Sequence, residues 1–124
     1  MPVALAVALG GTLGALSRYG LDRAIERRVD SLFPWSTFAV NISGCFAVGL
    51  VVATLVDRHD TPAWLRIGLT VGFLGAYTTF STFAQETLDL GKSGYTWLAL
   101  TDAVASVAVG VAFVYAGTAV GRML

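Results

Sequence analysis

The chain has 124 residues, of which 56% are hydrophobic and only 13% are charged, and its mean hydropathy is +0.72. A soluble domain carries charge on about a quarter of its residues, so this composition excludes a soluble enzyme. Eight basic and eight acidic side chains give a net charge of zero, which provides no basic footprint for a nucleic-acid partner.

Four apolar segments separated by short polar stretches fill the sequence. A helix needs about 20 apolar residues to cross a bilayer, so four such helices account for the whole chain. We therefore predict one all-α domain over residues 1–124, in a multi-pass protein of the plasma or inner membrane. Trp and Tyr side chains stand near the segment ends, as in interfacial aromatic belts. The predicted spans are Val3–Tyr19, Trp35–Val56, Trp64–Leu90 and Tyr95–Val120.

The first segment begins without a basic region ahead of it, so we expect a retained helix and not a signal peptide. A charged connector, Leu21–Pro34, follows, and its spacing of acids and bases suits a short amphipathic helix at the membrane surface. The second segment contains Asn41 and Ser43, and the polar loop behind it holds His59, expected to be solvated. Cys45 is the only cysteine, which excludes an intrachain disulfide, and we expect it to pack among apolar side chains.

The third segment contains the most informative run of the sequence, Gly72–Phe83. Polar groups at membrane depth are costly unless they face protein or water, so they indicate an ion or substrate path. The 27 residues of this segment would form a straight helix of about 40 Å, longer than a hydrocarbon core of about 30 Å. We predict a break near Gly75–Thr79, because non-helical backbone at this depth can hold ions. The hydroxyl residues of the run are Thr78, Thr79, Ser81 and Thr82.

Basic residues divide almost evenly between the two ends of the predicted bundle. Four lie in the first and third connections and three lie on the other side, so the positive-inside rule selects no orientation. Insertion in both orientations would give a two-fold dimer with its axis in the membrane plane. The basic residues are Arg23, Arg27, Arg28 and Lys92 on one side, and Arg58, Arg66 and Arg122 on the other.

In order and spacing, the whole chain resembles the Fluc or CrcB family of small fluoride channels. The Thr-Thr-Phe-Ser-Thr-Phe run is the most specific part of the match, whereas the glycine-rich patch of the first span would be weak alone. The patches that carry the resemblance are Gly10–Tyr19, Trp35–Gly44, Gly72–Phe83, and Ser106 with Gly110.

The resemblance implies an antiparallel dual-topology homodimer of four-helix subunits, each with a broken third helix. Such a dimer has two pores that export fluoride passively and exclude chloride, so the protein would be a channel and not an enzyme. It also implies one structural Na⁺ on the two-fold axis, held by backbone carbonyls at the positions of Gly75 and Thr78. A hard cation prefers oxygen ligands of this kind.

The resemblance assigns pore roles to several side chains, and each has a plainer alternative. Aromatic ring edges are positive and could contact a dehydrated anion, but Phe80 and Phe83 could equally form a core stripe. Asn41 offers amide donors or an interhelical hydrogen bond. Hydroxyl groups could donate to an anion or bond the carbonyl four residues back. The hydroxyl residues matched to the family's polar track are Ser81, Thr82 and Ser106.

The sequence leaves the roles of two charged residues, Arg18 and Asp102, undecided. Arg18 could draw anions toward a vestibule, bond backbone carbonyls, or extend to the membrane surface without a special role. Asp102 departs from the family pattern, and could lie at the interface, cap a helix, or pair with Arg18 or Lys92. The alternative function is a small dual-topology, proton-coupled multidrug exporter, but such exporters need a carboxylate in the first span, where this chain has none.

Overall fold

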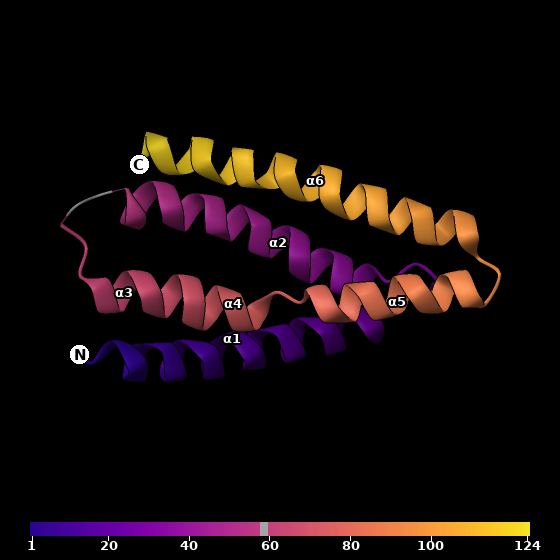
Figure 1. Cartoon of the computed structure of the whole chain (residues 1–124), viewed down its shortest axis with the longest axis horizontal. Helices are drawn as coiled ribbons and strands as arrows, with labels where there is room; N and C mark the ends of the chain where they lie inside the picture. The colour runs from indigo at the N-terminus through magenta and orange to yellow at the C-terminus, as the bar shows by residue number, and fades with distance from the viewer. Residues whose placement is uncertain (58–59) are drawn as a thin grey trace.

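The computed structural model describes residues 1–57 and 60–124, and within those residues every regular element of secondary structure is a helix (Figure 1). Arg58, counted above as a basic loop residue, and His59, predicted to be a solvated loop residue, lie outside the described residues. In the part of the chain that the structure describes, four helical stretches are long and apolar enough to cross a membrane, which confirms the predicted number of spans. They cover Val3–Glu26, Trp35–Val56, Ala63–Lys92 and Thr96–Met123.

The first helix, α1, runs from Val3 to Glu26 and is longer than predicted. The prediction of a separate surface helix in the connector was wrong, because Leu21–Glu26 continues α1 without a break. This stretch contains neither proline nor glycine, and its leucine, alanine, arginine and glutamate residues are good helix formers. The helix stops before the loop that leads to Pro34.

The second span begins after Pro34 as α2, Trp35–Val51, and ends in a π-helical stretch, η1, Val52–Val56. It packs along its length against the last helix, α6, Thr96–Met123. Glycines make this approach possible: a Cβ atom at Gly117 would overlap the Phe46 carbonyl group of α2. Small residues at helix interfaces allow such close packing in membranes.

The third span consists of several short elements: α3, Ala63–Ile67; η2, Gly68–Leu74; α4, Gly75–Tyr77; and α5, Phe80–Lys92. Between α4 and α5, Thr78 and Thr79 have extended backbone, with φ, ψ of −80°, 159° and −149°, 108°. The part before these residues packs on α1, and the part after them packs on α6 (Figure 1).

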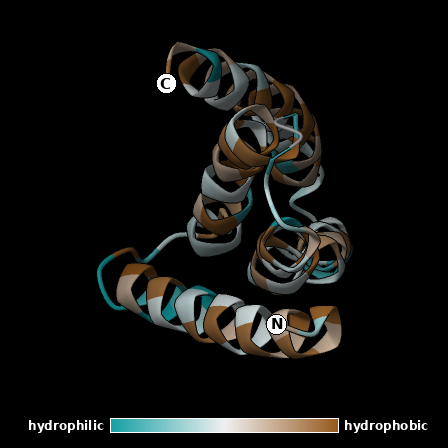
Figure 2. Ribbon diagram, turned by 90° about the vertical axis from the view of Figure 1, so that its left-hand side faces the viewer, coloured by the Kyte–Doolittle hydropathy of each residue, from teal (hydrophilic) through white to brown (hydrophobic). Residues whose placement is uncertain are grey.

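The connections alternate between the two ends of the bundle. Both termini, the end of η1 and the start of α3 lie at one end, and the α1–α2 connection and the α5–α6 turn lie at the other (Figure 1). Hydrophilic ribbon is concentrated where α1 passes into its connection to α2 (Figure 2). Large apolar side chains are exposed along the helices, as expected of a multi-pass membrane protein.

Candidate functional site: a clamped interruption between two cavities

The interruption of the third span is held by one side chain of α2. The Asn41 Nδ2 group donates to the Thr79 carbonyl at 3.0 Å, and the Thr79 amide donates to Asn41 Oδ1 at 2.8 Å. This pair of bonds satisfies both backbone groups of a residue that has left the helical ladder. The interhelical bond considered for Asn41 is therefore present. One Nδ2 proton remains for another acceptor, and the pore role of Asn41 stays a prediction.

Three hydroxyl groups follow one another at the start of α5. Thr79 caps the helix, since its Oγ1 accepts from the Thr82 amide at 3.2 Å. The same hydroxyl donates to Thr82 Oγ1 at 2.9 Å and lies 3.4 Å from Ser81 Oγ. Because Thr82 accepts this proton, its own hydroxyl proton can be offered to another acceptor. Of the hydroxyl groups in the predicted run, only that of Thr78 bonds the carbonyl four residues back, on Leu74.

The two phenylalanines of the run stand next to each other on the first turn of α5. Their ring centroids are 5.6 Å apart and their planes are inclined by 51°. Phe80 is 78% exposed, whereas Phe83 is half-buried. Within this chain, therefore, Phe80 is not part of a buried core stripe.

Most of the predicted pore residues line one cavity of about 420 Å³ on the α2 side of the interruption. Thr82 and Arg18 instead line a second cavity, of about 230 Å³, near the start of α5. Ser81 is exposed and lines neither of these cavities. The predicted residues around the first cavity are Asn41, Gly75, Thr78, Phe80, Phe83 and Ser106.

Arg18 reaches the interruption from α1. Its Nη1 group donates to the Thr78 carbonyl at 3.4 Å, a long bond from a half-buried side chain. Of the roles considered for this residue, the structure places it in contact with a backbone carbonyl. The guanidinium also lines the second cavity, where it lies among the hydroxyl residues Thr37, Thr79 and Thr82.

The carbonyl groups of Gly75 and Thr78 were assigned to Na⁺ by the resemblance, and their surroundings fit oxygen ligands. The Thr79 amide would normally bond the Gly75 carbonyl in a helix, but it donates to Asn41. The Gly75 carbonyl is therefore released from the ladder. The Thr78 carbonyl accepts the long Arg18 bond and keeps a second lone pair.

Asp102 lies in the interior between α5 and α6 and is only 1% exposed. Its Oδ2 atom is 3.1 Å from Thr87 Oγ1, and its Oδ1 atom accepts from Ser106 Oγ at 3.1 Å. It neither caps a helix nor pairs with Arg18 or Lys92, so these two suggestions were wrong. Ser106 does not bond the carbonyl four residues back, because its hydroxyl donates to the Asp102 side chain instead.

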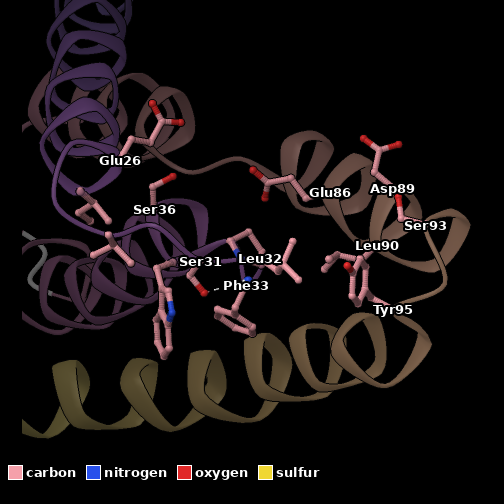
Figure 3. A pocket seen from close by; sticks show the side chains of 14 residues that line it. Glu26, Ser31, Leu32, Phe33, Ser36, Glu86, Asp89, Leu90, Ser93 and Tyr95 are labelled. Carbon is pink, nitrogen blue, oxygen red and sulfur yellow. Dashed lines mark hydrogen bonds between the residues drawn. The ribbon is translucent and has the colours of Figure 1, made fainter.

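Sequence reasoning missed the contact between Thr37 and Glu86. Thr37 Oγ1 donates to Glu86 Oε1 at 2.9 Å, which links α2 to the middle of α5. Glu86 also faces a cavity of about 350 Å³ where the α1–α2 connection meets the end of α5 (Figure 3). An acidic residue inside the third apolar segment was the signal that could have identified this contact.

Comparisons with known proteins agree with one another. The model of the family described as CrcB-like protein, Camphor Resistance (CrcB), matches residues 5–118. A protein of Solibacter usitatus named fluoride-specific ion channel FluC is 45% identical over 118 residues, covering 95% of this chain and 97% of that protein. A protein of Acidobacterium capsulatum with the same name is 45% identical over 120 residues, covering 95% and 94%. One of Geobacter sulfurreducens, also so named, is 39% identical over the full length of both chains.

Proposed function

Because this chain belongs to the CrcB-like family, we propose that it is a fluoride-selective channel through which fluoride leaves the cell passively. The observation that carries the proposal is the agreement between near-full-length relatives named as fluoride channels and a polar interruption inside a membrane span. Its function is transport and not catalysis, as the relatives' names indicate.

We propose that donor groups around the interruption replace the water around fluoride. Thr82 and Ser81 offer hydroxyl protons at the start of α5, and Asn41 keeps one amide proton beside the first cavity. Hydrogen bonds to an ionised partner are about twice as strong as neutral ones, so a few donors can offset much of the dehydration cost.

The rings of Phe80 and Phe83 would contact fluoride together with these donor groups. An anion is attracted to the positive edge of an aromatic ring and repelled by its face. The exposed Phe80 ring lines the same cavity as Asn41, so its edge can contact an ion that Asn41 also reaches. A larger, more weakly hydrated anion such as chloride gains less from these donors.

We propose that a second, antiparallel copy of the chain completes the channel, with one Na⁺ between the two interruptions. The Gly75 and Thr78 carbonyls of each subunit would supply oxygen ligands, giving four by symmetry. The cation would stabilise the extended backbone and would not be transported. Replacing Na⁺ by a bulkier cation should impair fluoride flux from either side, and indifference to the cation would contradict this site.

The rival function, a proton-coupled exporter, finds no specific support. Such exporters need a carboxylate in the first span, whereas Asp102 lies on α6, where it is enclosed against α5 with two hydroxyl partners. It also lies outside the cavity that the predicted pore residues share.

The test of the proposed function is ion efflux from liposomes that contain the purified protein in sodium buffer. We expect rapid voltage-driven loss of fluoride and no loss of chloride above that of protein-free liposomes. Equal loss of both anions would contradict selectivity, and loss of neither would contradict channel function.

A further inference from the structure

Among the described residues, Asp102 has no charged partner, although it is almost completely buried. A buried carboxylate is normally paired with a cation or neutralised by a proton. The partners of Asp102 are the hydroxyl groups of Thr87 and Ser106, both 3.1 Å away. Within residues 1–57 and 60–124, the only ion pair joins Arg23 to Glu26, near the C-terminal end of α1, and does not involve Asp102.

No basic side chain of the surrounding elements pairs with Asp102. On α5, Glu86 and Asp89 are acidic, and the one basic residue is Lys92, at the end of the helix, which forms no ion pair with Asp102. The packed helix α2 carries no charged residue, and its only titratable side chain is Cys45. On α6 itself, the one basic residue is Arg122, at the opposite end of the helix. An ionised Asp102 would therefore stand uncompensated inside the bundle.

The Thr87 hydroxyl has two acceptors within reach but only one proton. The Thr87 hydroxyl is 2.8 Å from the Phe83 carbonyl and 3.1 Å from Asp102 Oδ2. A threonine hydroxyl has one proton, and a carbonyl has none to give. If Thr87 donates to Phe83, which is the shorter contact, the contact with Asp102 is a hydrogen bond only when Asp102 supplies the proton.

We propose that Asp102 is a protonated carboxylic acid in the conducting protein and that loss of its proton closes the neighbouring cavity to fluoride. The proposal rests on the proposed channel function. The proton on Oδ2 is donated to Thr87, and Oδ1 accepts from Ser106. Asp102 is therefore a positioning residue, which acts on the cavity through Ser106 and does not line it.

Ionisation of Asp102 has two consequences for an anion in the cavity. Ser106 lines the cavity together with Asn41, Phe80 and Phe83. A carboxylate would hold the Ser106 proton more strongly and withdraw that donor from fluoride. It would also place a negative charge one side chain away, where the low dielectric strengthens repulsion. Conduction is therefore complete at low pH and is lost as pH rises through the titration of Asp102.

The first test is the pH profile of voltage-driven fluoride efflux from liposomes, with equal pH on both sides and the leak of protein-free liposomes subtracted. In a series of buffers from acidic to alkaline pH, we expect wild-type flux to fall roughly tenfold or more. Asp102→Asn keeps the size of the side chain and cannot titrate, so its flux should vary less than about twofold over this range. Asp30→Asn, a matched change in an exposed loop, should follow the wild type.

The second test needs no flux. A difference infrared spectrum of the wild type minus Asp102→Asn at neutral pH should show the carbonyl stretch of a protonated carboxyl group. Absence of that band overturns the inference, as does a flat wild-type profile or a profile that Asp102→Asn retains. No fluoride flux in any variant overturns the proposed function and the gating role, and the infrared band then decides the protonation alone.

Discussion

At the residue scale, Asn41 joins two helices at the point where the backbone leaves the helical ladder. We predict that Asn41→Ala lowers both fluoride flux and the free energy of unfolding, the latter by about 1–3 kcal/mol, because the Thr79 amide and carbonyl lose their partners. The control is Thr54→Ala, which removes a hydroxyl bonded to the Leu50 carbonyl of its own segment. Thermal unfolding in detergent and liposome efflux are the measurements. Unchanged flux with normal stability would show that the clamp is dispensable.

Phe80 provides a sharper test of the conduction path, because its exposed ring contributes little to the packing of the chain. We predict that Phe80→Ile reduces fluoride flux by roughly tenfold or more, since the ring edge is lost while most of the bulk is kept. Phe113→Ile, a matched change at an exposed position of α6, should leave the flux near the wild-type value. If both variants conduct like the wild type, Phe80 has no role in the pore.

At the scale of elements, glycine spacing determines how closely α1 approaches the first half of the third span. A Cβ atom at Gly14 would overlap the Phe73 carbonyl, whereas one at Gly20 on the same helix meets nothing within 4 Å. We predict that Gly14→Ala destabilises the protein by about 1–3 kcal/mol through overpacking, and that Gly20→Ala is neutral or stabilises it by up to about 1 kcal/mol. Equal unfolding temperatures for the two variants would contradict this packing.

The number of membrane spans could be predicted from the sequence, but the contacts between them could not. Apolar runs of about 20 residues predict four spans because the bilayer fixes the length of a spanning helix. The end of α1 was missed because the charged residues of Leu21–Glu26 are compatible both with a surface helix and with a longer first helix. The sequence places Asn41 in the second span, but only the packed structure shows that its side-chain amide donates to the Thr79 carbonyl and accepts from the Thr79 amide.

The same limit explains what was missed around the site. The bonds of Asp102 to Thr87 and Ser106, and of Glu86 to Thr37, join residues whose separation in sequence gives no rule for pairing across helices. The hydroxyl run was recognised because its residues are adjacent, and its internal bonds follow from the cap at Thr79.

At the scale of the whole molecule, the proposed antiparallel dimer requires that the chain insert in both orientations. We predict that Ser93→Cys, in the exposed α5–α6 turn and in a Cys45→Ala background, is labelled by a membrane-impermeant thiol reagent to about half from either side of the membrane. The Cys45→Ala protein alone is the control for background labelling. Complete labelling from one side would exclude dual topology.

The most direct test of the central claim, passive and fluoride-selective conduction, is the reversal potential in a planar bilayer under a fluoride gradient without a pH gradient. We predict that it equals the equilibrium potential of fluoride and stays there when chloride is exchanged for a large impermeant anion. A reversal potential that moves with chloride would contradict selectivity. One that is set by an imposed pH gradient would contradict passive conduction and favour a proton-coupled exporter.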